Sequence, residues 1–415
     1  MRVLFLKKIN LLIGALLLTL LTFSLVIYPK EGVQAATAGL KIFWEVVFPS
    51  LLPFFVLSEI LMGIGVVHFL GVLLEPLMRP LFNVPGVGAF ALSMGLAAGY
   101  PMDAVITGKF RRANMCTRIE GERLLSFTNT ADPLFIFGAV AVGMFGRQEL
   151  GFIMGIAHYI ASFTVGFIYR FYRADRQESN KEPEVILQSN ILHRAVRALI
   201  KARQEDGRTF GKLMGDAVKE SMSTILMIGG FIMLFSVLVR MLEVFGILTL
   251  ITPVIGAALK IFNLDPSLAN AVFNGILEID LGTMAASKVA APLGDRVIVA
   301  SWIIAWSGLC VHGQVASVIN DTDIRMGPYM IARLLHGIFA AFFTWLLFIK
   351  IYPVIGVMEN VIPVWHGYNP LERLILSGRQ MLIIVGILLV ASFISYLSNK
   401  YKLVYLNKNK TVKEL

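Results

Sequence analysis

The chain has 415 residues, of which 57% are hydrophobic and only 15% are charged. Soluble proteins average about 25% charged residues, so this composition excludes an ordinary water-soluble domain and indicates an integral membrane protein. In a soluble protein the formal net charge of +10 would suggest nucleic acid as a partner. In a membrane protein, Lys and Arg gather in cytoplasmic loops, so we expect no nucleic acid partner.

The N-terminal segment has two interpretations. Residues 2–8 are basic, residues 11–28 are apolar, and Val33-Gln34-Ala35 resembles a signal-peptide cleavage site. The apolar run is long for a signal peptide and has the length of a membrane span. We therefore interpret the segment as an uncleaved first helix.

Apolar segments close to the roughly 20 residues that a spanning helix needs follow one another along the chain. The candidates are 9–28, 44–66, 69–82, 86–108, 126–146, 150–170, 221–245, 249–262, 267–291, 297–320, 330–352 and 380–398. The short segments 69–82 and 249–262 suit interfacial helices, tilted helices or the arms of re-entrant hairpins. The sequence thus predicts an all-α integral membrane protein with about 10–12 transmembrane or re-entrant helices.

The polar segments predict the orientation. Basic residues crowd 109–123, the long polar stretch 171–220 and the tail after Asn399. The positive-inside rule places these segments and both chain ends on the cytoplasmic side. We expect 109–123 to be a loop and 171–220 to be a linker that is partly helical and partly flexible.

The linker separates two halves that resemble each other. LFNV at 81–84, for example, matches IFNL at 261–264. With the orientation above, the two halves cross the membrane in opposite directions, which is the inverted-repeat plan of many secondary transporters. The predicted units are an N-terminal helix with an outside loop (1–43), a first repeat (44–170), the linker (171–220), a second repeat (221–356), and an outside loop, last helix and basic tail (357–415).

Polar and helix-breaking residues at membrane depth are costly, so each cluster of them calls for a reason. The first cluster holds Gly99, Tyr100, Pro101 and Asp103. Proline removes a backbone donor and glycine adds freedom, so the helix should unwind there and present backbone groups to a solute. The alternative is a simple kink with Asp103 at the membrane interface.

The second cluster, at 126–133, holds Thr128, Asn129 and Thr130. As a plain helix start it would have Asp132 as N-cap, followed by proline at the first helical position. Its place in an apolar segment favours a hairpin tip instead. The helix N-terminus at such a tip presents amides and partial positive charge to an anion.

The third cluster places two carboxylates, Glu278 and Asp280, inside the apolar segment 267–291. Both cannot face lipid, so we expect them to bind a coupling ion, a proton or a cationic group of a solute. The alternative is an internal salt bridge with Lys288 or Arg240.

The fourth cluster holds Ser307, His312 and Gln314 in segment 297–320. His312 can hydrogen-bond a carboxylate or carry a proton near neutral pH, and the glycine and glutamine beside it favour a functional role. A lone histidine in a packed helix is more often structural, and we interpret His158 and His336 in that way.

Enzyme motifs are absent from the sequence. It contains no GxxxxGK[ST], HExxH or GxSxG, so neither ATP hydrolysis nor a hydrolase reaction is expected. Cys116 and Cys310 are too few for a zinc site and are not expected to pair. We therefore expect no enzyme activity, no cofactor and no metal.

Several of these motifs resemble those of the YlbJ family of sporulation integral membrane proteins. The resemblance spans nearly the whole chain. It rests on FWEVVFPSLLPFF at 43–55, LLEPLMRPLF at 73–82, GYPMD at 99–103, residues 126–135 and 275–282, and HGQ at 312–314. The family has two gate repeats similar to those of concentrative nucleoside transporters and of the ferrous-iron permease.

The resemblance implies a protein of endospore-forming bacteria that is needed for late spore maturation, including the cortex. It implies movement of dipicolinic acid out of the mother cell across the outer forespore membrane. The expected partners are this small solute and the lipid bilayer, and a homo-oligomer is compatible with the sequence. The expected substrate-binding residues are Gly99, Tyr100, Pro101, Asp103, Thr128, Asn129, Thr130, Ser307, His312 and Gln314, with Glu278 and Asp280 binding a coupling ion or proton.

Three other functions stay open at this point. The chain could be a non-transporting assembly or signalling protein with 171–220 as its docking segment. It could be a membrane enzyme that acts on lipid-linked cortex precursors, although the missing enzyme motifs count against this. It could also transport another small solute, such as a nucleoside.

Overall fold

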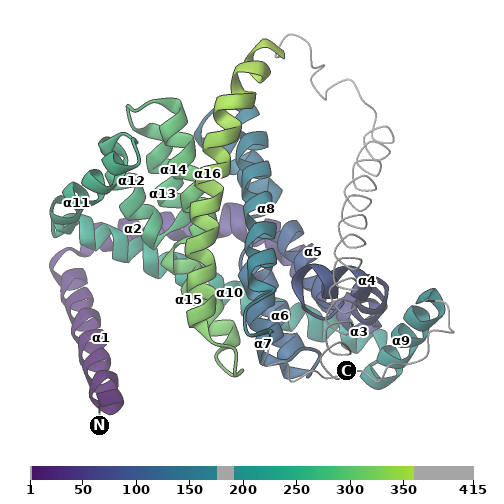
Figure 1. Ribbon diagram of the computed structural model, residues 1–415. Helices are drawn as coiled ribbons and strands as arrows, with labels where there is room; N and C mark the ends of the chain where they lie inside the picture. The colour runs from purple at the N-terminus through teal and green to yellow at the C-terminus, as the bar shows by residue number, and fades with distance from the viewer. Residues whose placement is uncertain (1, 175–190, 359–415) are drawn as a thin grey trace, which may run out of the picture.

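The computed structural model describes residues 2–174 and 191–358 (Figure 1). In these ranges the regular structure is helical and contains no strand. By length and composition, four of the described helices can cross a membrane, and the bent pair α3–α4 raises the number to five. The fold is therefore an all-α integral membrane protein, as predicted. The predicted segment 380–398, the basic tail and residues 175–190 of the linker lie outside the described residues.

The first half is a run of helices with short breaks. It comprises α1 (Arg2–Ile27), α2 (Pro29–Ile42), the π-helix η1 (Phe43–Val47), α3 (Phe48–Ile64), α4 (Val66–Phe82), α5 (Gly88–Ala98), α6 (Met102–Arg112), α7 (Arg118–Thr128), the π-helix η2 (Leu134–Met144) and α8 (Glu149–Tyr169). Helices α3 and α4 meet at an angle of 82° around Gly65, which has a φ of 91°. Glycine adopts this left-handed conformation without strain, so the short segment 69–82 can turn away from α3.

The second half begins with the linker helix. It comprises α9 (Ile191–Asp206), α10 (Phe210–Val244), α11 (Ile247–Ile261), the 3-10 helix η4 (Pro266–Leu268), α12 (Ala269–Leu277), α13 (Ile279–Lys288), α14 (Leu293–Trp306), α15 (Gly308–Ile319) and α16 (Met326–Met358). Helix α9 packs against α4 and α3. The linker is thus partly helical, as predicted, and its helix is docked on the first repeat.

Both halves use the same order of elements. Each has two helices joined at a left-handed glycine (Gly65 or Gly246), two interrupted helices (α5–α6 and α7–η2, or α12–α13 and α14–α15) and one unbroken helix (α8 or α16). The matching tetrapeptides also share their shape. Asn83 and Asn263 are both left-handed, with φ of 55° and 57°, and each follows the second helix of its repeat.

The two unbroken helices lie side by side and run in opposite directions (Figure 1). Near the end of α8, the Tyr169 hydroxyl donates to the Pro328 carbonyl at the start of α16 (2.6 Å). Just before α8, Arg147 donates to the Tyr352 hydroxyl near the end of α16 (2.7 Å). The packing across the repeats is reciprocal, because α8 contacts α14 and α16 contacts α7, in addition to the contacts of each helix within its own repeat. These features confirm two inverted repeats.

One prediction about the loops is wrong. Segment 109–123 is largely helical, because α6 continues to Arg112 and α7 begins at Arg118. A capping box starts α7: the Thr117 hydroxyl accepts from the Glu120 N–H (3.3 Å), and the Glu120 carboxylate accepts from the Thr117 N–H (2.8 Å). The dense charge of the segment concealed this helix start.

Candidate functional site

Four helix interruptions fall in the four predicted clusters. They lie at 99–101, at 129–133, at Glu278 and at Ser307. Residues 126–133 therefore contain the end of α7, a break and a capped helix start, because Asp132 Oδ1 accepts from the Phe135 N–H (2.9 Å), as expected for an N-cap. Helix ends have backbone groups without partners in the helix, so each break offers polar groups inside the apolar body.

In the first repeat the two breaks touch. Asp103 is fully buried in the first turn of α6 and accepts hydrogen bonds from Thr128 Oγ1 (3.1 Å) and Asn129 Nδ2 (2.7 Å). A Cβ atom at Gly99 would lie 2.6 Å from Asp132 Oδ2, so only glycine allows this approach. Asp103 thus faces the second break, and the alternative of an interfacial Asp103 is wrong.

In the second repeat the two breaks also meet. Glu278 is buried and caps α13, since its Oε2 accepts from the Leu281 N–H (2.7 Å). A Cβ atom at Gly308 would lie 3.1 Å from backbone atoms of Glu278. The Trp306 indole donates to the Ile276 carbonyl (3.1 Å), which ties the end of α14 to the end of α12.

Contacts between the repeats join these pairs of breaks. The Tyr100 hydroxyl donates to the Ile304 carbonyl near the fourth break (2.9 Å). The Tyr329 hydroxyl donates to Asn129 Oδ1 at the second break (3.0 Å), and the Tyr329 ring lies 5.3 Å from the ring of His312. We call the resulting group the polar centre: Tyr100, Asp103, Thr128, Asn129, Glu278, Ser307, His312, Tyr329 and Arg333.

Two members of the polar centre, Tyr329 and Arg333 on α16, were not predicted from the sequence. Arg333 is fully buried, and its guanidinium donates to the carbonyls of Asn129 and Ser126, the latter at 2.7 Å. Its Nε has no hydrogen-bond partner. A signal was available, since an arginine inside a spanning segment is by itself a reason to suspect a site.

The two histidines interpreted as structural lie beside the polar centre. The rings of His158 on α8 and His336 on α16 are 4.5 Å apart. His158 Nε2 accepts from the Ala131 N–H (3.0 Å), and His336 Nε2 donates to the His158 carbonyl (2.9 Å). These bonds hold the second break against both unbroken helices, as a structural role requires.

The other predicted residues are less connected. Gln314 is buried, but its Nε2 contact is with Cys310 Sγ one turn away (3.5 Å). Thr130 Oγ1 lies 3.4 Å from the Thr128 carbonyl, a marginal hydrogen bond within its own break. Neither contact reaches another break.

The alternative that the third cluster is an internal salt bridge is wrong for the described part of the chain. There Arg240 pairs with Glu243 (3.1 Å), and neither Glu278 nor Asp280 is in an ion pair. Asp280 lies in the first turn of α13. The helix N-terminus carries partial positive charge and favours carboxylates at these positions.

Ion pairs also join the two repeats outside the polar centre. They join the region of α6 and α7 to the loop between α15 and α16: Arg111–Asp323 (2.7 Å), Arg112–Asp321 (2.7 Å) and Arg325–Glu122 (2.6 Å). We call them the ion-pair clasp. The Glu122 side chain is fully buried, whereas the aspartates are exposed and their pairs contribute little.

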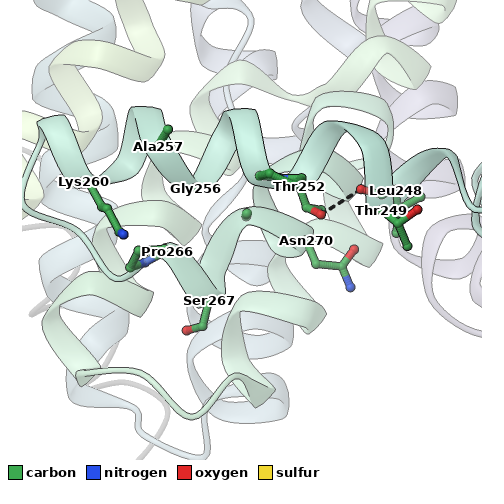
Figure 2. Close-up of a pocket in the computed structure, with 11 residues that line it drawn as sticks. Leu248, Thr249, Thr252, Gly256, Ala257, Lys260, Pro266, Ser267 and Asn270 are labelled. Atoms are coloured by element: carbon green, nitrogen blue, oxygen red, sulfur yellow. Dashed lines mark hydrogen bonds between the residues drawn. The ribbon is translucent and has the colours of Figure 1, made fainter.

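A cavity of about 660 Å³ lies away from the polar centre, between α11 and the start of α12 (Figure 2). Its Thr252 hydroxyl is bonded to the Leu248 carbonyl of the same helix (2.7 Å), and its Lys260 and Asn270 are exposed. None of the predicted site residues lines it. Helix α11 also exposes apolar side chains such as Leu250, so lipid suits this surface better than a solute.

Comparison with known proteins identifies the family. Residues 44–174 match the Gate family model, which is described as nucleoside recognition. The chain is 44% identical over 347 residues to the sporulation integral membrane protein YlbJ of Bacillus subtilis (strain 168). This match covers 84% of the chain and 85% of that protein.

Solved structures give a weaker likeness. An outward-facing variant of CNTnw and its inward-facing, substrate-bound state are both 13% identical to this chain, with TM-scores of 0.37 and 0.39. Each match covers 78% of this chain, and 86% and 85% of the respective structures. Scores this low carry no argument, but the identity to YlbJ extends over most of both sequences. The chain belongs to the YlbJ family of sporulation integral membrane proteins.

Proposed function

We propose that this protein transports a small solute through the polar centre, and that the solute is dipicolinate, the planar dianion of pyridine-2,6-dicarboxylic acid. One observation carries the proposal: four helix breaks, two from each inverted repeat, meet around buried polar side chains. Transporters with inverted repeats bind solutes where broken helices from both repeats meet. A scaffold has no need to unwind helices at membrane depth, where unpaired backbone groups cost several kcal/mol.

The chemistry of the polar centre supports an anion. Helices α6, η2, α13 and α15 all begin at the breaks, so four N-termini with partial positive charge lie there. Asp132 and Glu278 already cap η2 and α13, whereas the first turn of α15 has no acidic residue. Asn129 and His312 add hydrogen-bonding groups, and Tyr100 adds an aromatic ring. A nucleoside is the second candidate solute, because residues 44–174 match a family model described as nucleoside recognition.

Glu278 and Asp280 would repel a dianion unless they are protonated or hold a cation. We therefore propose that transport is coupled to a proton or cation at these two positions. The double variant Glu278→Gln, Asp280→Asn removes both charges and keeps an oxygen that can cap Leu281. Coupling should be lost in this variant, and transport that still responds fully to the ion gradient would refute this part of the proposal.

The proposed place of action is the outer forespore membrane of a sporulating cell. Membership in a sporulation family supports this place, and export of dipicolinate from the mother cell would connect the protein to maturation of the spore and its cortex. The basic segments support cytoplasmic chain ends. The alternative of a docking linker loses support, because α9 already packs against α4 and α3 of its own chain.

The direct test is uptake of radiolabelled dipicolinate into proteoliposomes that contain the purified full-length protein, with and without a pH gradient. We expect saturable uptake that the double variant Asn129→Ala, His312→Ala abolishes. A matched control, Asn270→Ala with His193→Ala, removes the same side chains at exposed positions and should transport normally. If folded protein takes up no dipicolinate under any gradient, the solute assignment is wrong, and uridine uptake would then test the nucleoside alternative.

A further inference from the structure

Arg333 is a charged residue buried inside the membrane-spanning part of the protein. It lies in α16, within a span candidate that runs from Met326 to Lys350, and none of its surface is exposed. A charged side chain in the middle of a membrane helix is unfavourable by about 2.5 kcal/mol or more on insertion scales. Such residues face a protein interior and mark solute or ion pathways.

Arg333 makes no ion pair among the described residues, and its charge acts on the Asp103 carboxylate only through space. Two neutral carbonyls, those of Ser126 and Asn129, accept hydrogen bonds from its terminal nitrogens. The Nε–H is buried and makes no hydrogen bond. The connection to Asp103 is indirect, since Asn129 donates to that carboxylate (2.7 Å). A buried cation with an unused donor is unfavourable unless something else binds it.

The fold of the repeat does not require an arginine at this position. The unbroken helices can be aligned on His158 and His336, which contact each other across α8 and α16 and lie 178 residues apart, close to the offset of the matching tetrapeptides. With the same spacing, Gly155 on α8 corresponds to Arg333 on α16. The Phe137 ring covers Gly155, where a Cβ atom would lie 2.8 Å away. One repeat therefore packs its unbroken helix with a glycine where the other buries a cation.

The surroundings of Arg333 suit a carboxylate. Its guanidinium lies 5.7 Å from the Tyr329 ring centroid, beside the second break and on the same side of α16 as the ring that contacts His312. A guanidinium is a planar fork of donors that matches the two oxygens of a carboxylate. We propose that Arg333 binds a carboxylate group of the transported solute and thereby makes the site selective for anions. This proposal rests on the proposed transport function and adds to it the residue that recognises the carboxylate of the solute.

The test compares dipicolinate with its neutral diamide, which has the same shape but no carboxylates. Binding of each to purified full-length protein is measured by calorimetry, for the wild type and for Arg333→Gln and Arg333→Lys. We expect the glutamine variant to weaken dipicolinate binding about 10- to 100-fold and to leave the diamide unchanged, because a charge-assisted pair is lost. Lysine keeps the charge but not the fork, so Arg333→Lys should fall between the two.

Arg123 provides the matched control. It is also a buried arginine that binds backbone carbonyls, those of Asn83 (2.8 Å) and Tyr172 (2.7 Å), but it lies outside the polar centre and its Nε is bonded. Arg123→Gln should lower the unfolding temperature without changing the preference for dipicolinate over the diamide. A purely structural role for Arg333 predicts the same behaviour for both arginines.

The outcomes separate this proposal from the transport function. Wild-type uptake of dipicolinate together with unchanged binding by Arg333→Gln refutes the role of Arg333 alone. If that variant does not fold, the wild-type protein still tests the proposal. Equal affinity of the wild type for dipicolinate and for the diamide would show that no cationic side chain binds the carboxylates. Wild-type protein that neither binds nor transports dipicolinate refutes the transport proposal itself, and this proposal with it.

Discussion

Replacing Asn129 by alanine tests the geometry of the polar centre. The side chain of Asn129 donates to Asp103 Oδ1 (2.7 Å) and accepts from the Tyr329 hydroxyl (3.0 Å), and all three residues are buried. Hydrogen bonds between membrane helices contribute ~0.6 to ~1.7 kcal/mol each, and a buried group left without a partner costs ~1–3 kcal/mol. Because Asp103 keeps its bond from Thr128, we expect Asn129→Ala to lower the free energy of unfolding by about 2–4 kcal/mol.

The assay is reversible denaturation of the full-length protein in detergent micelles, followed by tryptophan fluorescence. Asn270→Ala is the control, because Asn270 is exposed and its loss should change the free energy of unfolding by no more than about 0.5 kcal/mol. If Asn129→Ala proves as stable as this control, Asn129 does not bridge the two repeats. The breaks of the two repeats would then not form one site.

Three further perturbations probe other parts of the structure. Gly308→Ala should destabilise the protein by about 1–3 kcal/mol, because Gly308 has a φ of 76° and the backbone at the third break leaves no room for a side chain. The control is Gly211→Ala on α10, where no atom lies near the added Cβ, and it should be neutral or slightly stabilising. Thermal unfolding of the two variants measures the difference. Arg325→Ala leaves the buried carboxylate of Glu122 with only the more distant Arg118 (4.0 Å) as its cation. We expect a loss of about 1–3 kcal/mol, reduced because the Arg325 side chain is 41% exposed, and full stability in this variant would contradict a role for the clasp. Hydrogen bonds from Arg208 hold the pKa of Asp206 below its ordinary value. The contribution of this interaction to stability is therefore present at neutral pH and is lost as the pH falls below about 4. Asp206→Asn should remove this contribution at neutral pH and speed tryptic cleavage between α9 and α10; an unchanged rate would contradict this.

The helix breaks could be predicted because their chemistry is local. Gly99 and Pro101 interrupt α5–α6 through glycine freedom and the missing proline donor. Glu278 has neither glycine nor proline beside it, but its carboxylate caps the next helix, so its charge in an apolar segment was the useful signal. The inverted repeat was visible for the same reason, since Asn83 and Asn263 mark the same turn in both halves.

The charge of Arg333 in a spanning segment was a signal, but its contacts could not be predicted from the local sequence. Its partner Asn129 lies 204 residues earlier in the chain, and α16 otherwise reads as a continuous apolar helix. A single charge in such a segment gives no hint of what it contacts. The start of α7 was missed although its signal is local. The capping pattern of Thr117 and Glu120 was present, but the high charge of 109–123 led to the prediction of a loop.

A structure of the full-length protein in lipid nanodiscs with dipicolinate bound, determined by electron cryomicroscopy, would locate the solute site directly. If the polar centre binds the solute, we expect ligand density between the breaks of both repeats and within hydrogen-bond reach of Asn129 and Arg333. Ligand density in the cavity between α11 and α12, lined by Lys260 and Asn270, would contradict the assignment of the polar centre as the solute site. The absence of density in the polar centre at saturating dipicolinate would contradict it as well.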